Sequence, residues 1–177
     1  MAGALAAVVM ALGLCASLAS PAAASNLGEG EPCARYAWPL ERETDLLKEP
    51  AGAVQASPEA RWESGIGSAF RLALEPGGTA RFALPPEREA VNETWFGGAV
   101  TLPAPAEAGL YQVSVSKHAW IDVVQNGALV ASEDFTGEKD CPVRKSVRFN
   151  LVAAPFVVQI SDAAEAELSV VVTPAAE

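Results

Sequence analysis

WIDVVQNGALVA, residues 120–131, is the stretch of the chain that decides the fold. Two apolar runs, residues 120–124 and 128–131, bracket the polar triplet Gln125-Asn126-Gly127. Asn-Gly readily adopts the positive φ angles that a tight hairpin turn needs. The stretch therefore predicts a β-hairpin.

Runs of a similar kind lie on both sides of this hairpin. Tyr111, Val113 and Val115 alternate with polar residues, which predicts a strand with one apolar and one wet face. The nearly continuous apolar runs 156–160 and 168–172 are typical of central strands in a sandwich core. Further strands are predicted over residues 95–102 and 143–151.

A second hairpin is predicted over residues 70–84, where apolar residues alternate on either side of Pro76-Gly77-Gly78. The polar, Pro-containing stretch 85–94 then predicts a loop. With about nine strands and no long helix, residues 68–177 are expected to form an all-β, two-sheet antiparallel β-sandwich, either immunoglobulin-like or jelly-roll.

Residues 25–67 are less regular and contain one candidate helix, residues 39–48. Pro39 suits a first helical turn, Leu46 and Leu47 provide an apolar face together with Leu40, and Pro50 marks the end. This segment is therefore expected to be irregular except for one short helix.

The first 24 residues resemble a secretory signal peptide. They carry no charge, contain an apolar run at residues 5–14, and end in small residues, which predicts cleavage after Ala24. Cys15 suggests a lipoprotein as an alternative, but Leu14 fits that processing site poorly. We expect a periplasmic or secreted protein, with no membrane insertion after the signal is removed.

Two cysteines remain in the mature chain, Cys33 and Cys141. In an oxidising compartment an isolated pair favours a disulfide over a metal site, which would need further ligands. The sequence thus predicts one bridge that closes most of the domain.

The charge balance argues against a nucleic-acid partner. The chain has 12 Lys and Arg against 22 Asp and Glu, a net charge of −10. Binding to a phosphate backbone needs clustered cations, so we expect no nucleic-acid binding.

No constellation of residues indicates catalysis, metal binding or a cofactor. His118 is the single histidine, whereas metal hydrolases and non-haem iron oxygenases usually need at least two imidazole ligands. Glu133 and Asp134 lie close in sequence to Asp140, which leaves open an acid-pair hydrolase or a weak calcium site. We expect no catalytic residue, no metal and no cofactor.

Three segments carry a resemblance: Gly109-Leu110-Tyr111-Gln112-Val113, then Ala119-Trp120-Ile121-Asp122-Val123-Val124, then Cys141-Pro142-Val143-Arg144-Lys145-Ser146-Val147. Together they resemble a family of small secreted β-sandwich proteins of alphaproteobacteria, some of which carry the name homogentisate 1,2-dioxygenase. Genuine homogentisate dioxygenases are longer cupin enzymes that hold iron with two histidines and a glutamate. A chain with His118 alone cannot match that set, so the resemblance implies export and fold, and no catalytic residue is carried over.

The interpretation that follows is a non-catalytic periplasmic module that binds a small ligand, a glycan or another envelope protein. The surface predicted for binding is formed by His118, Trp120, Asp122, Arg144 and Lys145. The alternatives are an enzyme, either a dioxygenase or an acid-pair hydrolase, and a purely structural envelope protein.

Overall fold

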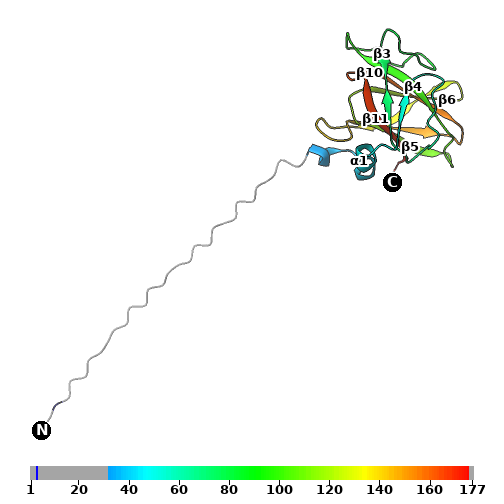
Figure 1. Ribbon diagram of the computed structural model, residues 1–177. Helices are drawn as coiled ribbons and strands as arrows, with labels where there is room; N and C mark the ends of the chain where they lie inside the picture. Colours follow the sequence, from blue (N-terminus) through cyan, green and yellow to red (C-terminus); the bar gives the residue numbers. More distant parts are fainter. Residues whose placement is uncertain (1–2, 4–31, 176–177) are drawn as a thin grey trace.

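The computed structural model describes residue 3 and residues 32–175. Two β-sheets pack face to face, and one short helix, α1 (Glu41–Lys48), lies against the outside of one of them (Figure 1). Every strand pairing is antiparallel except that of β1 with β2. The predicted antiparallel β-sandwich is confirmed, whereas the predicted signal peptide and Cys15 lie outside the described residues.

The described residues form eleven strands, where the sequence predicted about nine. The six-stranded sheet has the order β1 (Ala53–Gln55), β2 (Phe70–Ala73), β11 (Glu167–Pro174), β5 (Gly109–Val115), β9 (Lys145–Leu151), β8 (Ser132–Thr136). The five-stranded sheet has the order β3 (Glu75–Pro76), β4 (Phe96–Leu102), β10 (Phe156–Ala163), β6 (Trp120–Gln125), β7 (Ala128–Val130). The unpredicted strands β1, β3 and β8 are short or polar, so they lack an apolar alternation.

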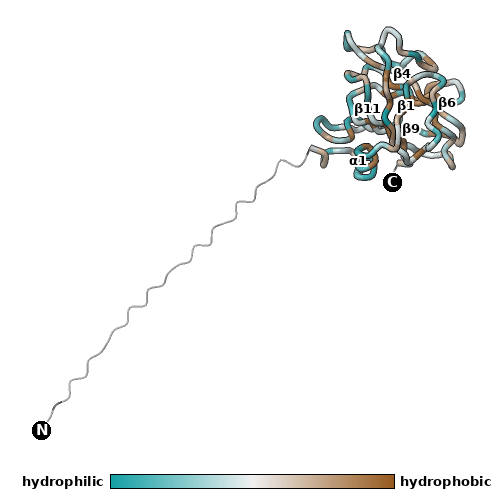
Figure 2. The backbone as a smooth tube through the Cα atoms, viewed as in Figure 1, coloured by the Kyte–Doolittle hydropathy of each residue, from teal (hydrophilic) through white to brown (hydrophobic). Residues whose placement is uncertain are grey.

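One apolar core fills the space between the sheets. Figure 2 shows hydrophobic colour along much of the strands and hydrophilic colour along several loops. The predicted central runs are central: β10 lies between β4 and β6, and β11 lies between β2 and β5. The largest fully buried side chains of the core are Phe70, Leu72, Leu102, Phe149, Leu151, Phe156, Ile160 and Leu168.

The hairpin predicted over residues 120–131 is confirmed. Asn126 and Gly127 adopt φ angles of 53° and 76°, and Gln125 pairs with Ala128 across the turn. Two successive positive φ angles give the turn a twist that matches the twist of the flanking strands.

The hairpin predicted over residues 70–84 is wrong. β2 pairs with β1 and β11, the chain then crosses to the five-stranded sheet as β3, and residues 80–84 form no strand. Phe82 instead stacks on Trp95, with ring centroids 6.3 Å apart. The alternation of residues 80–84 does not produce a strand, because these residues bond the side chain of Gln159 on distant β10 and pair with no neighbouring strand.

The wet face predicted for residues 111–115 is also wrong, because Gln112 and Ser114 are buried. The segment that contains α1 packs on this outer face of the six-stranded sheet and forms a second apolar cluster there. Ser114 and Ser146 share a hydrogen bond of 2.8 Å, and the hydroxyl of Thr173 donates to the carboxylate of Glu43. The members of the cluster are Trp38, Leu40, Leu47, Ala69, Val143 and Val171.

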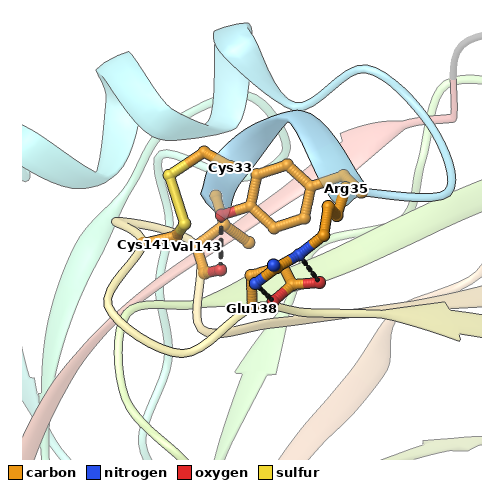
Figure 3. Close-up of a disulfide and its surroundings, with 6 residues drawn as sticks. Cys33, Arg35, Glu138, Cys141 and Val143 are labelled. Atoms are coloured by element: carbon orange, nitrogen blue, oxygen red, sulfur yellow. Dashed lines mark hydrogen bonds and ion pairs between the residues drawn. A yellow bond between two sulfur atoms is a disulfide. The ribbon is translucent and has the colours of Figure 1, made fainter. Parts of the chain in front are cut away.

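The N-terminal segment is fastened by the predicted disulfide between Cys33 and Cys141, whose Cα atoms lie 5.7 Å apart (Figure 3). Cys33 lies in a short 3-10 helix, η1 (Pro32–Arg35), and Cys141 lies in the loop before β9. Arg35 donates two hydrogen bonds to Glu138 at 3.1 and 2.8 Å beside the bridge (Figure 3). The predicted helix is present as α1 (Glu41–Lys48). The disulfide and the Arg35–Glu138 hydrogen bonds hold the N-terminal segment against the rest of the domain.

Candidate functional site

A cavity of about 300 Å³ opens at one edge of the sandwich, where β6 of one sheet faces β8 and β9 of the other. β7 pairs only with residues 123–125 of β6, so residues 120–122 have a strand neighbour on one side alone. Side chains from both faces of β6 therefore reach this edge. The cavity is lined by Glu87, Arg88, Trp120, Ile121, Ser132, Phe135, Lys145, Val147 and Phe149.

Trp120 is the fixed aromatic wall of the cavity. Its indole Nε1 donates a hydrogen bond to Oδ1 of Asp122 at 2.7 Å. Residues two apart on a strand project on the same face, which is why this pair can meet. The ring is half-buried and held in one orientation by a neighbour on its own strand.

Two cations contact this indole. The Lys145 ammonium lies 4.5 Å from the centroid of the Trp120 ring, and the Arg88 guanidinium carbon lies 5.4 Å from it. The same ammonium lies 6.0 Å from the ring of Phe135, whose side chain is 69% exposed. Cations favour the electron-rich faces of aromatic rings, so the rings hold the two positive groups at the mouth of the cavity.

The electrostatic environment of Lys145 disfavours its charge. Burial lowers the pKa of this ammonium, the nearby charge of Arg88 lowers it further, and Asp122 acts in the opposite direction. Among the described residues, no ion pair within 4 Å involves Lys145, Arg88 or Arg144. The charge of Lys145 is thus partly desolvated and lacks a carboxylate at contact distance.

Asp122 links the cavity to the loop that covers the five-stranded sheet. Its Oδ2 accepts a hydrogen bond from the backbone N–H of Glu87 at 3.2 Å. Burial raises the pKa of this carboxyl, and the hydrogen bonds from Glu87 and Trp120 oppose that shift. Asp122 therefore positions both the indole and the loop residues that line the cavity.

Two residues of β10 fasten the same loop. Oε1 of Gln159 accepts from the N–H groups of Ala83 and Leu84 at 2.6 and 2.9 Å. Farther along, Oδ1 of Asp162 accepts from the backbone and side-chain nitrogens of Asn92 at 3.1 and 2.7 Å. We call residues 77–95 the covering loop, because these bonds hold it on the outer face of the sheet.

The structure brings together three of the five residues predicted for binding. Trp120 and Lys145 line the cavity, and Asp122 is bonded to Trp120. His118 is exposed just before β6, and partial desolvation of its imidazole, followed by the charges of Arg144 and Lys145, lowers its pKa. Arg144 lies in the loop directly before β9 and is not among the lining residues.

Sequence reasoning missed Arg88 and Phe135. Arg88 lies in the polar covering loop, and Phe135 lies on β8, whose sequence Ser-Glu-Asp-Phe-Thr has no apolar alternation. No local signal points to either residue, since both reach the cavity through long-range folding.

The acidic residues considered for hydrolysis are exposed and lie outside this cavity. Glu133 accepts a hydrogen bond from Asn150 at 2.7 Å, and Asp134 accepts one from the N–H of Phe135 at 2.7 Å. Asp140 has a φ angle of 68° in the turn before Cys141. In the part of the chain that the structure describes, no three or more His, Cys, Asp or Glu residues gather to hold a metal ion.

No protein-family model matches the sequence, and no curated protein matches it either. None of the helices in residues 32–175 has the length and apolar character required to span a bilayer. The site's own geometry is therefore the basis for inferring what it does: it offers a rigid indole, an exposed phenyl ring and two cations around a small concave surface.

Proposed function

We propose that this chain is an exported binding module that holds a small molecule in the cavity between β6 and β9. The observation that carries the proposal is the Trp120 ring, which Asp122 fixes at 2.7 Å while leaving it half-exposed to the cavity. A fixed aromatic surface loses little conformational entropy when a ligand stacks on it.

The dimensions of the cavity favour a small molecule over a protein partner. Its volume of about 300 Å³ lies at the lower end of the range for small-molecule sites. Buried apolar walls, Ile121, Val147 and Phe149, adjoin polar groups that can orient a ligand. Such a combination is typical of ligand sites in proteins.

The proposed place of action is the periplasm or the exterior of the cell. The predicted signal peptide over residues 1–24 supports export, and the Cys33–Cys141 disulfide is compatible with a compartment outside the cytoplasm. Membership of the resembling alphaproteobacterial family belongs to the same proposal.

A fragment screen followed by NMR tests the proposed function. The full-length gene is expressed in a bacterial host with ¹⁵N labelling, and the protein is recovered from the periplasm. An intact mass that matches a chain starting at Ser25 shows that the signal peptide has been removed. The four tryptophans give four indole N–H signals, and Trp120→Phe identifies the signal of Trp120.

Trp62 provides the matched internal control. Its indole is half-buried, donates to the carbonyl of Ser68 at 3.2 Å and lies 4.9 Å from the ring of Phe70, away from the cavity. Fragments that shift the Trp120 signal and leave that of Trp62 in place support the proposal. If no fragment at millimolar concentration shifts the Trp120 signal, the proposal is overturned.

A further inference from the structure

We propose that the molecule bound in this cavity is a small organic anion, whose anionic group pairs with Lys145 and Arg88 while a flat apolar part lies on Trp120 and Phe135. This inference rests on the proposed function and names the chemical class of its ligand. Three observations lead to it.

The first observation is a local excess of positive charge in an acidic protein. The chain carries a net charge of −10, yet Lys145 and Arg88 both line the cavity, and Arg144 is close enough to influence the pKa of Lys145. None of these three cations forms an ion pair within 4 Å in the described residues. Two of these cations therefore line a single cavity, which concentrates positive charge at one place in an otherwise acidic chain.

The second observation concerns the two nearby carboxylates, Asp122 and Glu87. Asp122 already accepts hydrogen bonds from Trp120 and from the N–H of Glu87. Glu87 lines the cavity, and it forms no ion pair within 4 Å in the described residues. Neither carboxylate neutralises Lys145 by contact, so a ligand carrying an anionic group supplies the missing partner.

The third observation is the exposed apolar surface beside these cations. Phe135 is 69% exposed on the edge strand β8, and its ring lies 6.0 Å from the Lys145 ammonium. Covering such a ring removes apolar area from water, which favours binding. A flat apolar body attached to an anionic group satisfies both the rings and the cations, whereas a bare inorganic ion satisfies the cations alone.

Benzoate and benzamide test this inference, because they have the same shape and differ in charge. Their dissociation constants are measured by NMR at the Trp120 indole signal, with wild-type protein, Lys145→Met and Arg88→Met. Lys48→Met is the matched control, since Lys48 is an exposed lysine on α1, outside the cavity. Arg88 is exposed in the covering loop, so its variant keeps the test valid if Lys145→Met is poorly folded.

We expect benzoate to bind about tenfold more tightly than benzamide, the effect of one charge-assisted hydrogen bond. Lys145→Met or Arg88→Met should remove most of this preference, and Lys48→Met should leave it intact. Equal binding of the two compounds, unchanged in Lys145→Met, overturns the anion inference and leaves the proposed function standing. If neither compound shifts the Trp120 signal but neutral fragments do, the anion inference is likewise overturned and the proposed function stands. If no fragment shifts Trp120, the proposed function fails and the inference fails with it.

Discussion

Trp120 and Asp122 are joined side chain to side chain on one strand, with the indole Nε1 2.7 Å from the carboxylate Oδ1. The other carboxylate oxygen of Asp122 accepts from the N–H of Glu87 at 3.2 Å. A single buried side chain thus orients the aromatic wall of the cavity and anchors the loop that brings Arg88 to it.

Asp122→Ala should lower the free energy of unfolding by about 1–3 kcal/mol, because two donors then lose their acceptor. Asp122→Asn should lose less, since its amide oxygen can still accept from the indole. Urea denaturation measures both, with Glu63→Ala at an exposed position as control. An Asp122→Ala protein as stable as this control would show that the two hydrogen bonds do not anchor the site.

His118 should titrate below its ordinary pKa of 6.5, because partial desolvation and the charges of Arg144 and Lys145 oppose protonation of its imidazole. Because the folded state then binds the proton less readily than the unfolded state, the free energy of unfolding is highest above pH 6.5. It decreases as the pH falls from 6.5 through the folded-state pKa of His118. NMR of untagged protein measures this pKa without ambiguity, since the chain has one histidine.

The same titration reports the charge at the cavity. Lys145→Met should raise the pKa of His118 by removing a positive charge, and Lys48→Met should leave it unchanged. A His118 pKa at or above 6.5 in the wild type, or one that Lys145→Met does not change, would contradict the proximity of His118 to the positive charge of Lys145.

Part of this fold could be predicted from the sequence because its signals are local. The Asn126-Gly127 turn and the apolar runs that became β10 and β11 depend on neighbouring residues alone. Residues 80–84 misled because their hydrogen-bond partner, Gln159, lies more than seventy residues away. Ser114 was expected to face water because no local pattern announces that the α1 segment covers that sheet face.

The site divides in the same way. Trp120 and Asp122 share a strand face at a spacing of two residues, so their pairing could be inferred from the sequence. Arg88 and Phe135 could not, because a covering loop and a polar edge strand bring them to the cavity. The local pattern thus places Trp120 and Asp122, whereas long-range contacts place Arg88 and Phe135.

Gln159→Ala should release the covering loop, because the N–H groups of Ala83 and Leu84 lose the oxygen that accepts both. We expect faster trypsin cleavage after Arg81 and Arg88, which lie in this loop, under native conditions. Limited proteolysis with mass spectrometry measures the rate. Gln55→Ala is the control, since Gln55 is exposed and bonds the carbonyl of Ala73 away from the loop. Equal cleavage rates in the two variants would argue that Gln159 does not hold the loop.

Replacing both Cys33 and Cys141 by alanine should destabilise the protein. The bridge joins residues 108 positions apart, and the chain-entropy model assigns about 4–5 kcal/mol to a loop of that length. Urea denaturation of the double variant measures the loss, and nonreducing peptide mass spectrometry of the wild type should detect the linked pair. Two free thiols in the mature protein would show that Cys33 and Cys141 are not bridged.

Whether the cavity between β6 and β9 is a small-molecule site is decided by the fragment screen observed at the indole N–H of Trp120. We expect some fragments to shift this signal, to leave Trp62 unchanged, and to lose affinity in Phe135→Ser, which removes the exposed ring of the cavity. A Trp120 signal that no fragment moves, or one moved equally in wild type and Phe135→Ser, would contradict the claim that Trp120 and Phe135 together form a binding site.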